Sequence, residues 1–484
     1  MILLGYKATN CMNMTKNLSI FLVALLTVVL AACGGCKPNT QPDDPTIPPK
    51  PDTSEVVVPE EEKPDMSLIS QTVPVTDDWV WSGKPKITLH IENGNKMDVK
   101  VSTRVRITTD KGDLVIDMFD SVLVAANSFK DRVVTTPEKM DPGFYKAYCY
   151  VNGKRARFFV FGIDPFQIVS EPDMQPNFNS FWDAAKAQLA AIPMNANLIE
   201  LPRKSTEKRK VYLVELQSVP DGLSGEPVII RGYYCEPQDG QQHPVIMHFY
   251  GYDTQNSKSK VECPSGNASS YAEFYLSHRG QYINNRPESS REPDGLGDLT
   301  NIYGDWFAYH FGDKNSYYYR GAYMDCVRAV DFMASRETSD MNHLFAEGSS
   351  QGGALSYAAA ALSNYPFTAI APNVAFMGDF PDYFQIVNWP AETAMANKGS
   401  MSDDEMYAFL SYFDTKNLAT RISSAVIATS GLQDGTCPPH TNIAPFSNLQ
   451  TPESDKEYHI YPEMQHEFPV GWVSMYMQFF RDRM

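Results

Sequence analysis

The hydrophobic period of the chain changes near Pro165, and this change constrains the fold more than any other feature. Over residues 79–161 apolar and polar residues alternate, as in half-buried β-strands, with Asn93-Gly94 and Asn152-Gly153 at turns. After Pro165, short apolar runs alternate with stretches of helical period. The pattern predicts an all-β domain followed by an α/β domain.

The two predicted domains differ in architecture. Several short strands within residues 67–165 are typical of a β-sandwich of the immunoglobulin-like kind. In residues 166–484 the alternation predicts a mostly parallel sheet with helices on both faces. The candidate strands of this sheet are 228–233, 245–249, 344–346, 368–371, 425–429 and 457–461. The candidate helices include 178–192, 323–335 and 354–362.

The first 33 residues have the pattern of an export signal. Lys16 precedes an uncharged apolar run at 18–30, which suits a signal peptide and is short for a membrane span. The run ends in Leu30-Ala31-Ala32-Cys33, which resembles the lipobox of bacterial lipoproteins. We expect residues 1–33 to be a lipoprotein signal peptide with Cys33 as the lipidated residue. The alternative is an ordinary signal peptide with a coincidental cysteine.

A lipid on Cys33 would anchor an exported protein without spanning the membrane. The expected location is the bacterial outer membrane, with the domains facing either the periplasm or the cell surface. Residues 34–66 are rich in proline and acidic residues, so we expect an extended, solvated linker there.

Charge and cysteine usage exclude several classes of partner. The chain has 41 Lys and Arg against 58 Asp and Glu, a net charge of −17, which disfavours nucleic acid and acidic ligands. Six of the eight cysteines remain once the leader and Cys33 are set aside, and these six form no CxxC pair and no metal framework, so free thiols are expected. We expect no metal and no organic cofactor.

A strand, a tight turn and a helix are predicted in succession around Ser350. The apolar residues 344–346 precede Gly348-Ser349-Ser350-Gln351-Gly352, and the helix-forming residues 354–362 follow. A nucleophile elbow needs this order, because its serine adopts a strained backbone and the flanking glycines leave room where side chains would clash. We interpret Ser350 as a nucleophile and Ser349 as its inactive neighbour.

A serine hydroxyl becomes a nucleophile only when a base takes its proton, and a carboxylate must orient that base. Asp434 follows the buried strand 425–429, at the carboxyl end where open α/β sheets place active residues. His466 follows the last predicted strand and reaches the same rim. We therefore predict a triad of Ser350, His466 and Asp434.

The competing residues fit these roles less well. His459 lies inside a predicted strand, and His440 lies only six residues after Asp434 in the same loop. Three other acids occupy a polar, helical region and are interpreted as solvated surface: Asp403, Asp404 and Asp414.

Acyl transfer also requires donors for the oxyanion of the tetrahedral intermediate. One is expected to be the backbone N–H of Gln351, directly after the nucleophile. The second is assigned to the backbone N–H of Tyr252, in the loop after strand 245–249. Tyr252 and Trp389 are also candidates for lining the substrate pocket, with core packing as the alternative for Trp389.

Three ordered motifs carry a family resemblance: Arg279-Gly280-Gln281, Gly348–Gly352 and His466-Glu467. On these motifs, residues 178–484 resemble the acetyl xylan esterase and cephalosporin C deacetylase family, carbohydrate esterase family 7. The resemblance implies an α/β-hydrolase fold and a Ser-His-Asp triad. It also implies removal of acetyl groups from xylo-oligosaccharides and related small acetylated compounds.

The motif residues outside the triad are expected to support the site. Arg279, with Gly280 and Gln281, should brace nearby loops by binding backbone carbonyls or a carboxylate, with direct substrate contact as the alternative for Arg279. Glu467 either orients a loop beside the base or is simply exposed. Position 250 is Tyr where the family often has His. The family commonly forms hexamers and does not ordinarily carry the leader and β-sandwich, so an oligomer remains open here.

Three hypotheses for function follow. The first is a membrane-tethered serine esterase that deacetylates an acetylated oligosaccharide or small acetyl ester, with Ser350, His466 and Asp434 as its triad. The second is a serine peptidase of the prolyl oligopeptidase type. The third is an inactive, glycan-binding surface lipoprotein.

Overall fold

The computed structural model describes residues 62–222, 225–252, 261, 263–264, 270–281, 283 and 303–484. The predicted signal peptide, Cys33 and the predicted linker up to residue 61 lie outside these residues. None of the helices in the described part combines the length and the hydropathy that a bilayer crossing demands.

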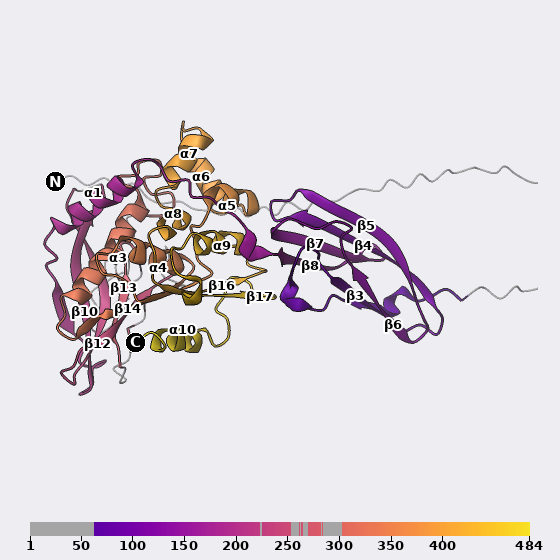
Figure 1. Cartoon of the computed structure of the whole chain (residues 1–484), viewed down its shortest axis with the longest axis horizontal. Helices are drawn as coiled ribbons and strands as arrows, with labels where there is room; N and C mark the ends of the chain where they lie inside the picture. Colours follow the sequence, from indigo (N-terminus) through magenta and orange to yellow (C-terminus); the bar gives the residue numbers. More distant parts are fainter. Residues whose placement is uncertain are drawn as a thin grey trace, which may run out of the picture. The chain divides into compact units, whose positions relative to one another are not determined.

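Residues 67–165, here called the β-domain, form two sheets of orders β1-β3-β6 and β2-β8-β7-β4-β5 (Figure 1). Residues at alternate positions of β3, including Ile87, Leu89 and Ile91, are buried in one core, as their period of two predicted. The immunoglobulin-like kind stays a prediction. The strands are β1 (Ile69–Thr72), β2 (Val80–Trp81), β3 (Ile87–Asn93), β4 (Val99–Thr109), β5 (Leu114–Val124), β6 (Ser128–Val134), β7 (Gly143–Val151) and β8 (Lys154–Ile163).

The α/β domain, residues 166–484, contains a nine-stranded sheet of order β17-β16-β15-β14-β12-β13-β11-β10-β9. The strands from β17 to β13 pair in parallel, whereas β13, β11, β10 and β9 pair antiparallel. The strands are β9 (Asn197–Glu200), β10 (Arg209–Pro220), β11 (Pro227–Pro237), β12 (His243–Phe249), β13 (Ala272–Ser277), β14 (Ser339–Ser349), β15 (Ala369–Asn373), β16 (Ala425–Gly431) and β17 (Lys456–Tyr461).

Helices cover both faces of this sheet (Figure 1). On β12, Val245, Met247 and Phe249 face the core that contains α1, α3 and α4, while Ile246 faces the core that contains α10. The helices are α1 (Phe178–Ala190), α3 (Tyr318–Ala334), α4 (Gln351–Leu362), α5 (Phe380–Ile386), α6 (Ala391–Asn397), α7 (Asp403–Leu410), α8 (Thr415–Ala419), α9 (Pro439–Ser447) and α10 (Trp472–Arg481).

The predicted strands correspond to β11, β12 and β14 to β17, and three strands were missed. The missed strands are β9, β10 and β13. Charged side chains interrupt the apolar pattern of β10, and the fold tolerates them because they are paired: Arg231 of β11, for example, bonds Glu215 of β10 at 2.9 Å.

The β-domain and the α/β domain share a core. Residues Lys63–Met484 cluster as one compact unit, so a domain boundary at residue 165 stays a prediction. Leu432 and Ile443 of the α/β domain are fully buried within the core of the β-domain. Leu432 lies two residues before Asp434, and the β-domain therefore packs against the loop that carries the predicted catalytic acid.

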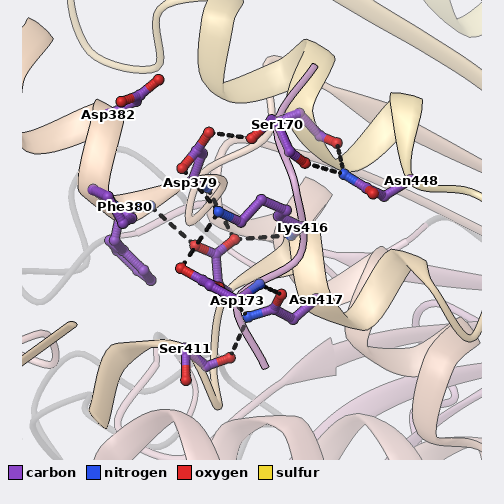
Figure 2. A network of polar contacts seen from close by, with 12 residues as sticks. Ser170, Asp173, Asp379, Phe380, Asp382, Ser411, Lys416, Asn417 and Asn448 are labelled. Carbon is purple, nitrogen blue, oxygen red and sulfur yellow. Dashed lines mark hydrogen bonds and ion pairs between the residues drawn. The ribbon is translucent and has the colours of Figure 1, made fainter. Parts of the chain in front are cut away.

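A buried network around Lys416 holds Ser170 and Asp173, in the segment of the α/β domain that directly follows the β-domain (Figure 2). The Lys416 ammonium lies 3.0 Å from Asp379 and 3.4 Å from Asp173. Asp173 also accepts a hydrogen bond from Asn417 at 2.7 Å, and Ser170 bonds Asp379. A buried ammonium is tolerated here because carboxylates surround it.

A second ion cluster joins the domains at His440 of α9. The ring lies 3.0 Å from Asp110 of the β-domain and 2.9 Å from Asp382 of α5. Lys111 of the β-domain pairs with Asp382 at 2.5 Å. Burial alone would lower the pKa of His440, but the hydrogen bonds and charges of Asp110 and Asp382 outweigh it and raise the pKa to about 9.

This pKa predicts a pH-dependent stability. A histidine whose pKa is higher in the folded state than its unfolded value near 6.5 stabilises the fold fully below pH 6.5, and the contribution disappears as the pH rises through about 9. This difference in pKa corresponds to a contribution of about 3 kcal/mol to the free energy of unfolding. We expect the protein to melt well above its His440→Gln variant at pH 6 and close to it at pH 10. The same difference in melting temperature between the two proteins at pH 6 and at pH 10 would contradict the proposed role of His440.

Candidate active site

Ser350 lies between β14 and α4 in a strained backbone conformation. Its φ of +58° is in the left-handed region, which residues other than glycine rarely adopt. A Cβ on Gly348 would collide with the backbone of Gly352, and one on Gly352 would collide with the backbone of Phe249. The two glycines are therefore required by close backbone approach, and the turn presents the Ser350 hydroxyl at the end of the sheet.

The structure brings the three predicted triad residues together. The His466 Nε2 atom lies 3.0 Å from the Ser350 hydroxyl oxygen, and His466 Nδ1 lies 2.8 Å from Asp434 Oδ2. In the tautomer that satisfies both contacts, Nδ1–H donates to the carboxylate and Nε2 accepts from the hydroxyl. This is the arrangement in which imidazole can take the serine proton.

The Asp434 carboxylate is fixed from behind by its own loop. Its other oxygen accepts hydrogen bonds from the backbone N–H groups of Thr436 and Cys437, both at 2.8 Å. The side chain is fully buried, whereas the His466 side chain keeps 28% of its exposure. The acid is thus held rigidly inside the protein, and the base remains accessible to a substrate.

The Gln433 side chain joins the loops that carry the acid and the base to the β-domain. Its amide oxygen accepts from the N–H of Val160 in β8 at 2.9 Å, and its amide nitrogen donates to the carbonyl of Val160 at 3.0 Å. The same nitrogen donates to the carbonyl of Pro462 at 2.7 Å. Residue 433 precedes Asp434, and residue 462 opens the loop that ends with His466.

The competing acids and histidines lie elsewhere. His440 is bound in the interdomain cluster, and His459 lies within β17. Asp403 and Asp404 are exposed in the first turn of α7, as expected. The expectation for Asp414 was wrong, because it is only 1% exposed. Its carboxylate caps α8 and accepts from the N–H groups of Asp379 and Phe380, so local polarity gave no measure of its burial.

The predicted oxyanion donor Gln351 is the first residue of α4. Its N–H has no acceptor within the helix, because the first four N–H groups of a helix lack one. Its side chain is clamped at both ends: Tyr319 donates to its oxygen at 2.8 Å, and its nitrogen donates to His278 Nε2 at 2.9 Å. Burial lowers the pKa of His278 to about 4, so this ring is neutral and can accept that bond.

The second predicted donor, Tyr252, lines a cavity of about 650 Å³ together with Ser350 and His466. Its hydroxyl donates to Asp305 at 2.7 Å. Burial, reinforced by the Asp305 carboxylate, raises the pKa of this phenol well above its usual value, so it stays protonated. The Gln281 side chain donates to the carbonyl of Gly251 at 3.0 Å and so fixes the loop that carries Tyr252.

Of the other residues expected to support the site, Arg279 forms a buried ion pair and Glu467 is exposed. Arg279 is 2% exposed, donates to Asp325 at 2.7 and 2.9 Å and to the carbonyl of Val219 at 3.0 Å. Burial opposes its charge, but Asp325 more than compensates and raises the pKa of the guanidinium. Gly280 has a φ of +73°. Glu467 is exposed beside the base.

Trp389 packs rather than lining the cavity beside Ser350. Its ring stacks on Phe376 with centroids 5.3 Å apart and lies 5.5 Å from the ring of Tyr252.

The described part of the chain contains four buried free thiols: Cys149, Cys235, Cys326 and Cys437.

Sequence reasoning assigned no role to three residues that position the site: His278, Tyr319 and Gln433. His278 directly precedes the Arg279 motif, so adjacency could have suggested it. No local pattern marks Gln433, because its partner Val160 is 273 residues away in the sequence.

The described part of the chain contains one group of side chains whose ligand atoms are close enough together to hold a metal ion: Asp379, Asp382 and His440. Lys416 and Lys111 already pair with these carboxylates. The cluster therefore fits an ion-pair network, and the triad geometry involves none of its members.

Comparisons with known proteins point to one family. Residues 167–483 match the family model described as Acetyl xylan esterase (AXE1). Acetyl esterase Axe7A of Xylanibacter ruminicola is 23% identical over 409 residues, which cover 83% of this chain and 90% of that protein.

Solved esterase structures share the fold. The acetyl xylan esterase from Paenibacillus sp. R4 is 28% identical with a TM-score of 0.52, over 66% of this chain and 98% of that one. Acetyl xylan esterase 1 from Thermoanaerobacterium sp. JW/SL YS485 is 21% identical with a TM-score of 0.52, over 65% and 95% of the two chains.

The family match covers more than half of the chain and contains all three converging side chains. The chain therefore belongs to the acetyl xylan esterase family and is a serine carboxylic ester hydrolase with an α/β-hydrolase fold.

Proposed function

We propose that the chain removes acetyl groups from acetylated xylo-oligosaccharides through an acyl-enzyme on Ser350. The observation that carries the proposal is the pair of contacts from His466, 3.0 Å to the Ser350 hydroxyl and 2.8 Å to Asp434. Membership of the acetyl xylan esterase family supports the choice of an acetyl ester as substrate.

The first half of the reaction acylates the serine. The Ser350 oxygen attacks the acetyl carbonyl while its proton passes to His466 Nε2, and Asp434 stabilises the imidazolium that forms. The N–H groups of Gln351 and Tyr252 are proposed to bind the oxyanion. Loss of one such donor typically costs about 3 kcal/mol of transition-state stabilisation. The carbon–oxygen bond to the sugar then breaks, and His466 returns the proton to the sugar oxygen.

The second half releases acetate. A water molecule gives its proton to His466 and attacks the acyl carbonyl, and the same two N–H groups bind the new oxyanion. Collapse of this intermediate breaks the bond to Ser350, whose oxygen regains the proton from His466. The exposure of the imidazole, 28%, gives water access to the base.

The β-domain is proposed to position the triad through Gln433. This side chain holds Val160 of the β-domain and Pro462 of the base-bearing loop at once, directly beside Asp434. Alignment of the acid and base to within a fraction of an ångström governs the rate more than substrate binding, so Gln433 should act on kcat rather than KM.

We also propose that the chain is exported as a lipoprotein anchored through Cys33. The apolar run at 18–30 that ends in Leu30-Ala31-Ala32-Cys33 supports this. The β-domain is proposed to be of the immunoglobulin-like kind, which its two sheets over one core support.

The decisive test of the proposed reaction is removal of the nucleophile. We expect Ser350→Ala to lower kcat for acetate release from acetylated xylo-oligosaccharides by about 10⁵-fold or more. The matched control Ser349→Ala removes the neighbouring hydroxyl and should leave kcat within about threefold. Proline-containing peptides serve as the second substrate. An equal loss of kcat in Ser350→Ala and Ser349→Ala would overturn Ser350 as the nucleophile. Cleavage of the peptides without release of acetate would overturn the assignment as an esterase.

Gln433→Leu tests the positioning role. The variant loses three hydrogen bonds, two to Val160 of β8 and one to Pro462 of the base-bearing loop. We expect kcat on p-nitrophenyl acetate to fall about tenfold with KM changed less than twofold. Gln450→Leu is the control, because among the described residues its side-chain amide bonds only the nearby carbonyl of Asn448. Thermal melting checks that both variants are folded at the assay temperature. A rise in KM at constant kcat would contradict the proposed role.

A further inference from the structure

A cavity of about 640 Å³ opens between the β-domain and the α/β domain. Its β-domain wall comes from β7, β8 and Asp110 after β4. The opposite wall comes from the loop after β16, the start of α9, the loop after β17 and the end of α5. We call this cavity the interdomain cleft. Its volume is within the range of ligand sites and is far larger than an acetyl group needs.

The cleft adjoins the catalytic loops. It is lined by Gln433, Asp434 and Gly435 of the acid-bearing loop, and by Gln465, the residue before the base His466. Under the proposed mechanism, His466 protonates the oxygen of the departing sugar, so the sugar leaves on the His466 side of the acyl group. Gln465 of the cleft directly precedes His466, and Asp434 of the cleft bonds it, so the cleft lies next to the base that protonates the departing sugar.

The lining suits an uncharged, polyhydroxylated ligand. The Phe158 ring is 42% exposed and offers an apolar face of the kind that packs on the C–H face of a pyranose. Lys146 and Arg157 supply donors, and Gln465 supplies a donor and an acceptor for hydroxyl groups.

The charges of the cleft nearly cancel. Lys146 and Arg157 are matched by Asp110 and Glu463, and Arg157 pairs with Glu463 at 2.7 Å. The remaining carboxylate, that of Asp434, is fully buried against His466. A lining without an excess of positive charge gives no attraction for phosphate or carboxylate ligands, which favours a neutral glycan.

We propose that the interdomain cleft binds the sugar units next to the acetylated one, so that the preferred substrate is an acetylated xylan chain of several units rather than a small acetyl ester. This inference rests on the proposed function, because it extends the same site. It assigns to the β-domain a substrate-binding wall in addition to its contacts with the catalytic loops.

Chain-length kinetics test the cleft. The substrates are acetylated xylo-oligosaccharides of two, four and six units, with p-nitrophenyl acetate as the ester too small to reach the cleft. We expect kcat/KM to rise about tenfold from two units to six, a difference equivalent to about 1.4 kcal/mol. In Phe158→Leu, which keeps apolar bulk and loses the ring, the ratio of kcat/KM for six units to that for p-nitrophenyl acetate should fall about tenfold.

The matched control is Phe129→Leu. Phe129 is a 60% exposed phenylalanine of β6 that does not line the cleft, so this ratio should stay within twofold of the wild-type value. A fall of the ratio in both variants, or the same kcat/KM for all chain lengths, would overturn the cleft as a binding site.

A binding measurement separates this inference from the proposed function. Unacetylated xylotetraose is titrated calorimetrically into Ser350→Ala and into the double variant with Phe158→Leu. We expect at least tenfold weaker binding to the double variant. No binding to either protein would overturn the cleft, even if acetate is released normally. Failure of the wild type to release acetate from any acetylated oligosaccharide would instead overturn the proposed function, and the titration would still decide whether the cleft binds glycan.

Discussion

The close backbone approach at Ser350 is the constraint on which the rest of the site depends. Gly348, Gly352 and the backbone of Phe249 lie so near one another that no Cβ fits between them, and the serine is held at a φ of +58°. Such strain persists only where the surrounding structure enforces it. Here β12, β14 and α4 enforce it, because the sheet and the helix pack against both sides of the turn.

The β-domain, which lies outside the family match, also helps to build the active site. Leu432 is buried in the core of the β-domain, and the Gln433 side chain holds β8 and the base-bearing loop together. The acid Asp434 follows directly. The position of the triad thus depends on both domains. The His440 cluster crosses the same interface, and the Lys416 network holds the segment that follows the β-domain (Figure 2).

Features with a local cause were predictable from sequence. The elbow around Ser350 and the loops that carry Asp434 and His466 follow from turn chemistry and from buried strands of recognisable period. Features that depend on distant partners were not. Strand β10 was not predicted because charged side chains interrupt its apolar pattern, and their partners lie on another strand. The burial of Asp414 depends on N–H groups 34 and 35 residues away. The partner of Gln433 belongs to another domain.

The central claim is that the convergence of these three side chains makes the Ser350 hydroxyl unusually nucleophilic. A fluorophosphonate reacts covalently with activated serines, and peptide mapping by mass spectrometry locates the modified residue. The account predicts one adduct per chain, on Ser350, which forms much more slowly in an Asp434→Asn variant. An adduct on Ser349 or on any other residue, or labelling at an equal rate in that variant, would contradict it.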